Sequence, residues 1–389
     1  MARLYRSAVF LALALLLAAC GGGSGEVEPT PTSPPADTST PAPAATETAQ
    51  PTPQVSAPDA PPATELSLPA GFTAYVVAEG FFRPTSIALA PDGTVYLSER
   101  HGNVYRLVDG EGDGVFEAKG VIATGFEEIT GLIVAPDGSV YVSSRGSVTV
   151  VGPGVTARGI ISGLPTGRHQ NNGLVFGPDG KLYLTNGSTC DDVHDCPAGG
   201  EPDERSATIL QANPDGSGLR VYARGLRNPY DLAFDASGRL WATDNGSDAP
   251  CATIDELNLI EDGGDYGWPY GELCDPYQSG IPPVASLGLH TAAAGIDYYD
   301  GQQFPAEYQG NLFVTVWGSL FAPPDPYDRV LLHLRQGRGG PAPGRITFVV
   351  EEFATGFQNP IDVVMDGNGT LLVLDYGSGK LYRIVYTGG

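Results

Sequence analysis

The chain has 389 residues, enough for one large domain or two of ordinary size. It carries 21 Lys and Arg against 45 Asp and Glu. The resulting formal charge of −24 argues against a nucleic-acid partner, because phosphate binding needs clustered basic residues. With 53 Gly, 34 Pro and 18 Tyr but only 2 Met, the composition favours many short strands joined by tight turns over a helical bundle.

The amino-terminal residues have the pattern of an export signal. Arg3 and Arg6 precede an apolar run over 8–19, shorter than the roughly 20 residues of a membrane-spanning helix. The run ends in Leu-Ala-Ala-Cys at 17–20, which resembles a bacterial lipobox in which Cys20 is lipidated. A plain signal peptide with an incidental cysteine is the alternative. We predict a signal peptide over 1–20 and a protein held outside the cytoplasm, at the cell surface or in the periplasm, with membrane contact only through that lipid.

Residues 21–65 contain no aromatic residue and consist mainly of Pro, Thr, Ala and Ser. Such a segment buries too little apolar surface to offset its chain entropy, so we expect a disordered tether there. The folded domain is then expected over 66–389.

The remaining cysteines form an even set, which in an oxidising compartment predicts two disulfides. Three pairings are possible among Cys190, Cys196, Cys251 and Cys274. Closeness in sequence favours Cys190–Cys196 and Cys251–Cys274. A zinc site is the alternative, but the spacings contain no CxxC pair.

The chain from 86 onward contains a repeat: an apolar strand, a turn often written Pro-Asp-Gly, and a second alternating strand. Clear copies start at 86, 131, 173, 231 and 362, and a degenerate fifth copy with an insertion starts at 295. Four-stranded units repeated six times predict an all-β, six-bladed β-propeller. The strand at 73–77 is expected to complete the last blade and close the ring.

The repeat also predicts which residues surround one mouth of the central channel. Eleven residues before each turn glycine stand Phe82, Glu127, His169, Arg227, His290 and Gln358. Six residues after the turn glycines, the second strands end in Glu99, Ser144, Asn186, Asp244 and Asp375, with Arg100, Arg145 and Asn245 next. We expect both sets to meet in one polar basin, because consecutive antiparallel strands return to the same edge.

Several segments resemble the quinoprotein glucose/sorbosone dehydrogenase family, six-bladed propellers that use pyrroloquinoline quinone (PQQ). They are RHQNNGLVFGPDGKLYLTNGS at 168–188, GLRNPYDLAF at 225–234, LWATDNGSD at 240–248, DELNLIEDGGDYGWP at 255–269 and HTAAAGIDYYDGQQFPAEYQGNLFV at 290–314. The resemblance implies an oxidoreductase that oxidises a sugar or polyol and passes electrons to an unknown acceptor. It implies His169 as catalytic base, Arg227 and Asn228 as PQQ contacts, and the carbonyls of Gly246 and Ser247 as Ca²⁺ ligands.

The sequence departs from glucose-oxidising members of that family. Ser188 stands in place of an Asp and Ile129 in place of a Gln, and basic residues are missing around 317–318 and 359–361. We therefore favour the sorbosone-like branch. Arg100, Arg145 and Arg329 are candidates to replace the missing cations. Two other functions stay open: a calcium-dependent lactonase-like propeller, and a non-catalytic, surface-tethered propeller that binds carbohydrate.

Overall fold

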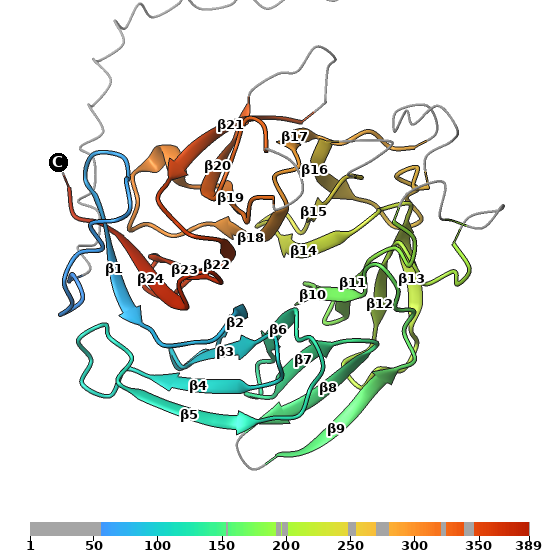
Figure 1. Ribbon diagram of the computed structural model, residues 1–389, viewed down its shortest axis with the longest axis horizontal. Helices are drawn as coiled ribbons and strands as arrows, with labels where there is room; N and C mark the ends of the chain where they lie inside the picture. Colours follow the sequence, from blue (N-terminus) through green and yellow to red (C-terminus); the bar gives the residue numbers. More distant parts are fainter. Residues whose placement is uncertain are drawn as a thin grey trace, which may run out of the picture. The chain divides into compact units, whose positions relative to one another are not determined.

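The computed structural model describes residues 56–152, 155–191, 196, 201–247, 254–269, 280–319, 324–337 and 346–388. These residues form six four-stranded antiparallel sheets, arranged as blades around a central axis (Figure 1). The expected all-β six-bladed propeller is therefore confirmed. Among the described residues, no helix has the length and apolar character needed to cross a bilayer.

Blades 1 to 3 each use four consecutive strands. The strands are β2 (Pro84–Leu89), β3 (Val95–Glu99), β4 (Val104–Val108) and β5 (Ala118–Ala123); β6 (Gly131–Val134), β7 (Val140–Ser144), β8 (Ser147–Gly152) and β9 (Val155–Ser162); and β10 (Asn171–Phe176), β11 (Leu182–Asn186), β12 (Thr208–Ala212) and β13 (Arg220–Arg224).

Blades 4 and 5 follow the same order, and blade 6 combines the two ends of the domain. The elements are β14 (Pro229–Phe234), β15 (Leu240–Asp244), β16 (Ile254–Ile260) and β17 (Ala285–Leu289); β18 (Ala293–Tyr299), the 3₁₀ turn η1 (Ala306–Tyr308), β19 (Asn311–Val316), β20 (Val330–Gly337) and β21 (Thr347–Ala354); and β22 (Pro360–Met365), β23 (Leu371–Asp375), β24 (Lys380–Tyr386) and β1 (Phe72–Ala78).

The ring closes as the sequence predicts. Strand β1 pairs antiparallel with β24, with Ala74 opposite Ile384, so the first strand of the domain completes its last blade. Closure leaves no blade without a neighbour, and the open edge that a linear array of sheets would expose is removed.

The described residues form seven apolar clusters, six of which lie one between each pair of neighbouring blades. Second strands such as β3 and β15 are buried at every position, because each inner strand is covered on both faces. Hydrogen bonds from backbone amides to buried carboxylates also cross the interfaces between neighbouring blades. Asp362 Oδ2 accepts the Ile87 N–H at 2.8 Å, and Asp231 Oδ2 accepts the Ile296 N–H at 3.1 Å.

Residues next to the expected domain boundary at 66 pack against the propeller. Ala63 and Leu66 are buried in the cluster between blades 5 and 6. Glu65 Oε1 accepts a hydrogen bond from Lys380 Nζ at 2.8 Å. The boundary at residue 66 stays a prediction. Residues 1–55, with Cys20 and most of the expected tether, lie outside the described part.

Candidate functional site

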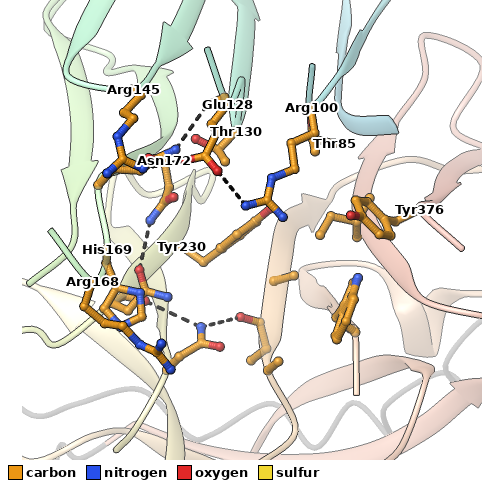
Figure 2. Close-up of a pocket in the computed structure, with 18 residues that line it drawn as sticks. Thr85, Arg100, Glu128, Thr130, Arg145, Arg168, His169, Asn172, Tyr230 and Tyr376 are labelled. Carbon is orange, nitrogen blue, oxygen red and sulfur yellow. Dashed lines mark hydrogen bonds and ion pairs between the residues drawn. The ribbon is translucent and has the colours of Figure 1, made fainter. Parts of the chain in front are cut away.

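A cavity of about 380 Å³ lies on the propeller axis and is lined by every blade (Figure 2). Six of its lining residues occupy one repeat position, the residue just before the start of each repeat copy. They are Thr85, Thr130, Asn172, Tyr230, Ala294 and Ile361. The walls come from residues that follow the second strands: Arg100, Arg145, Asn245, Trp317 and Tyr376. Two positions of the repeat, one just before the start of each copy and one just after its second strand, therefore supply both sets of lining residues.

The expected polar basin is partly corrected by the structure. Asp244, Asp375 and Glu99 end second strands as predicted, but they turn away from the cavity to cap backbone amides. Asp244 accepts the N–H groups of Arg227 and Asn228, at 3.0 and 2.7 Å. Asp375 does the same for Gln358 and Asn359. The next residue along each strand faces the cavity, because side chains alternate along a strand.

The eleven-residue step is correct for three of its six positions. His169, Arg227 and His290 line a second cavity of about 150 Å³, which shares Arg168, His169 and Asn228 with the first. In blade 2 the cavity residue is Glu128 rather than Glu127. The Glu128 backbone is left-handed, with φ 46°, and the Glu127 carbonyl accepts the Arg145 N–H. Phe82 is 63% exposed and lines neither cavity.

His169 is held by its backbone and presents its ring to the cavities. Its N–H donates to the Ser188 carbonyl at 3.0 Å. Its Nε2 is buried without a hydrogen-bond partner within the described structure. Burial, and then the nearby charges of Arg227 and Arg168, hold the pKa of His169 well below its usual 6.5. The imidazole is therefore neutral at neutral pH and able to accept a proton.

Gly187 makes room for this arrangement. In blade 3 it occupies the wall position held by arginine in blades 1 and 2. A Cβ at Gly187 would lie 2.5 Å from the His169 Cβ and 2.7 Å from Asn228 Oδ1. Any side chain there would displace the imidazole. A glycine at the repeat position where blades 1 and 2 have arginine is therefore a feature of the sequence that could have indicated room for the His169 side chain.

Arg227 is almost fully buried and ties together the loops beside His169. Nη1 donates to the Gly246 carbonyl at 2.6 Å, and Nε donates to the Asp191 carbonyl at 2.9 Å. The Asp191 carboxylate pairs with Arg227 Nη2 at 3.2 Å and with Arg168 Nε at 2.8 Å. One carboxylate is therefore shared by two guanidiniums beside His169.

Asn228 and Asn172 supply amide groups between these charges. Asn228 Oδ1 accepts a hydrogen bond from Asn172 Nδ2 at 3.0 Å, and both residues line the larger cavity. The rings of Trp317 and Tyr376 lie on another part of the wall, edge to face with centroids 5.9 Å apart. Guanidiniums, amides and aromatic rings together fit a planar molecule that carries carboxylates.

The calcium assignment of Gly246 and Ser247 stays a prediction. The Gly246 N–H donates to Asp255 Oδ1 at 2.8 Å, and its carbonyl already accepts a hydrogen bond from Arg227. Ser247 is buried at 1% exposure, and residues 248–253 lie outside the described part. A cation at the Gly246 oxygen would have to compete with the Arg227 guanidinium. We therefore derive no chemical step through calcium.

The loop after β11 carries the disulfide expected between Cys190 and Cys196. Glu201 stabilises the same loop, because its carboxylate accepts hydrogen bonds from Ser188, Thr189, Ser206 and Trp268. The Ser188 hydroxyl is therefore one of the donors that hold this carboxylate. The Ser188 carbonyl, in turn, positions His169. Cys251 and Cys274 lie outside the described residues.

Of the cations expected to replace the missing basic residues, Arg100 and Arg145 line the larger cavity. Arg329 lines neither cavity described here and lies near Asp328, 3.7 Å away. Repeat spacing missed Glu128, Arg168, Trp317 and Tyr376 as site residues. Tyr376 could have been found by stepping seven residues past Gly369, the same step that reaches Arg100 and Arg145 in the first two blades.

Fold and site together define a six-bladed propeller with a cationic cavity at its axis and a neutral histidine in the wall. Comparison with known proteins shows what the chain is similar to. Residues 157–320 match the family Glucose / Sorbosone dehydrogenase, which confirms the resemblance seen in the sequence.

Individual relatives agree. The chain is 28% identical over 204 residues to an uncharacterized protein of Borreliella burgdorferi, covering 48% of this chain and 54% of that one. It is 26% identical over 196 residues to quinoprotein glucose dehydrogenase B of Acinetobacter calcoaceticus, covering 46% and 37%. The match thus spans about half or less of these relatives.

The fold matches the PQQ-bound aldose sugar dehydrogenase of Streptomyces coelicolor. The TM-score is 0.59 at 21% identity, covering 82% of this chain and 99% of that one.

Proposed function

We propose that the protein is an oxidoreductase that oxidises a hydroxyl-bearing carbon of a sugar, with PQQ as its cofactor. The observation that carries this proposal is the unpartnered, buried Nε2 of His169 beside the Arg168–Asp191–Arg227 group. A buried nitrogen without a partner costs free energy, and of the two described histidines with such an Nε2, His169 and His333, only His169 lines these two cavities. A substrate hydroxyl bound in the cavity would provide the missing hydrogen bond to His169 Nε2.

The residues of the site divide into two tasks. Arg227, Arg168 and Asn228 would hold the carboxylates and carbonyls of the quinone next to the imidazole. His169 Nε2 would accept the proton of the sugar hydroxyl, and its lowered pKa keeps it free to do so. When bound, the ortho-quinone supplies the oxidising power by accepting a hydride from the same carbon. The sugar thereby loses one proton and one hydride, which converts a hemiacetal to a lactone or an alcohol to a carbonyl.

The experiment is a calorimetric titration of the purified protein with PQQ, followed by reduction of an artificial dye in the presence of sugars. We expect saturable PQQ binding and sugar-dependent dye reduction that requires PQQ. Absence of PQQ binding both with and without Ca²⁺ would contradict the proposal. Hydrolysis of sugar lactones without PQQ would assign the protein to the lactonase alternative.

We also propose that the domain is attached to the cell envelope through a lipid on Cys20. The support is the lipobox pattern at 17–20 and the Pro- and Thr-rich segment that follows it. Replacement of Cys20 by Ala is expected to move the protein from the membrane fraction to the soluble fraction of the host cell. Unchanged fractionation would exclude the anchor.

A further inference from the structure

A second arginine pair shares one carboxylate on the wall of the larger cavity. Glu128 lies between Arg100 and Arg145 (Figure 2), with Oε1 2.7 Å from Arg100 Nη2 and Oε2 2.7 Å from Arg145 Nη1. The arginine side chains are 42% and 38% exposed, so both remain accessible from the cavity. This Arg100–Glu128–Arg145 triad carries one net positive charge.

The triad has hydrogen-bond donors to spare. Each guanidinium has five N–H groups. Besides Glu128, Arg100 interacts with Tyr376, and Arg145 donates to Gln170 Oε1 at 3.3 Å. These contacts use fewer donors than the two guanidiniums possess. The remaining N–H groups form the fork that suits a second carboxylate.

The charge of the cavity runs against the charge of the protein. The chain has a formal charge of −24, yet the larger cavity is lined by three arginines and, among its described lining residues, by a single carboxylate, Glu128. The amides and hydroxyls of the lining, such as Asn172, Asn245 and Thr130, suit the hydroxyls of a sugar, and the arginines add cations that a neutral sugar does not need. An anionic molecule gains from these cations, because the field inside a narrow cavity concentrates on the ligand.

The triad and the imidazole belong to the same wall. Gln170 is the residue after His169, and its Nε2 donates to the Glu128 carbonyl at 3.1 Å while its Oε1 accepts from Arg145. Gln170 therefore links the triad directly to the residue next to it in sequence, His169. Arg168 and Arg227 flank His169 and line the smaller cavity, where the proposed function places the quinone.

We propose that the sugar oxidised at this site is a uronate, whose carboxylate binds Arg100 and Arg145 while its reacting hydroxyl faces His169. The inference rests on the proposed dehydrogenase function for the oxidation itself. Recognition of the carboxylate depends only on the triad and can be measured without turnover.

The binding test compares three ligands that differ at one position: methyl β-glucuronide, its neutral amide, and methyl β-glucoside. Each is titrated calorimetrically into the full chain, with and without PQQ. We expect the glucuronide to bind roughly tenfold to a hundredfold more tightly than either neutral ligand, as charge-assisted hydrogen bonds allow. This advantage should shrink as NaCl is raised, because both arginines are partly exposed to solvent.

Variants assign the effect to the triad. Arg100→Gln and Arg145→Gln should each remove most of the glucuronide advantage while PQQ affinity is kept. Glu128→Gln should raise glucuronide affinity, because it removes the competing carboxylate; a misfolded variant could not produce that gain. Arg220→Gln is the matched control, since Arg220 forms an exposed pair with Asp262 on the outer strand β13.

Equal affinity for the three ligands would overturn the inference. So would a loss of PQQ affinity, rather than glucuronide affinity, in Arg100→Gln or Arg145→Gln, since the triad would then hold the quinone. PQQ-dependent oxidation of neutral sugars without a uronate preference would contradict this inference alone. Glucuronide binding without any PQQ binding would instead contradict the proposed function alone.

Discussion

The Nε2 atom of His169 is buried without a hydrogen-bond partner among the described residues. Leaving such an atom unpaired costs about 1–3 kcal/mol, so a fold that keeps it gains something from the vacant position. Gly187 contributes to that position by having no side chain where a Cβ would meet His169. The absence of a side chain at Gly187 is therefore part of what positions the His169 side chain.

Replacement of His169 by Ala is expected to lower the rate of sugar-dependent dye reduction by about 10²- to 10⁴-fold, the usual contribution of a general base. PQQ affinity should change little, because the arginines remain. The measurement is steady-state dye reduction with the PQQ-loaded variant. His101→Ala is the control: His101 is exposed, lines neither described cavity and should keep full activity. A fully active His169→Ala would remove this residue from the mechanism.

At the scale of elements, second strands and loops divide the work. The second strand of a blade ends in a carboxylate that caps the incoming chain, as Asp244 and Asp375 do, and the next residue faces the cavity. The described residues of the loop after β11 lie outside the strands of the blade. The loop depends on Glu201, whose carboxylate joins it to Trp268 of a neighbouring connection.

Replacement of Glu201 by Ala is expected to lower the free energy of unfolding by about 2–3 kcal/mol, because several donors lose one charged acceptor. Urea denaturation followed by tryptophan fluorescence measures this change. The same substitution should also weaken activity, since Ser188, a ligand of Glu201, positions His169 through its carbonyl. Glu204→Ala, at an exposed neighbouring position, should change stability by less than about 0.5 kcal/mol. Equal losses of stability in Glu201→Ala and Glu204→Ala would contradict the role given to the Glu201 carboxylate in holding this loop.

At the scale of the whole molecule, the blades are joined near the axis by buried carboxylates. Burial raises the pKa of Asp297 and of Asp362 to about 7. Burial and then repulsion from Asp362 raise the pKa of Asp231 well above its ordinary value. Each group accepts a backbone N–H of the next blade, so these residues combine a structural role with a cost when charged.

Stability should therefore rise as the pH falls from about 8 to about 5. In that window the folded protein takes up protons at Asp297 and Asp362, whereas the unfolded chain binds them only near its ordinary pKa values of about 4. Carboxylates with a lowered pKa, such as Glu201, lose their contribution only at lower pH. The buried His169, whose pKa is lowered, opposes part of the rise, because the unfolded chain takes up that histidine proton near pH 6.5. Calorimetric unfolding temperatures at four pH values test this. Asp297→Asn should show a smaller rise, and a flat or falling profile in the natural protein would contradict the account.

The sequence by itself determined the architecture. Strand, turn and strand recur with turn glycines such as Gly93 and Gly180 in the left-handed region, and such a local signal survives in every clear copy. The ring closure through β1 and the histidine at 169 follow from the same register. The disulfide between Cys190 and Cys196 followed from their short separation.

Only the tertiary structure decided which charges share a carboxylate. Arg100 and Arg145 come from different blades, and a left-handed backbone at Glu128 brings one carboxylate between them. Arg227 and Arg168 likewise share one carboxylate, that of Asp191. A repeat encodes how each blade folds. The charge of the cavity, however, depends on side chains from six blades that converge on one axis, and local spacing does not record that convergence.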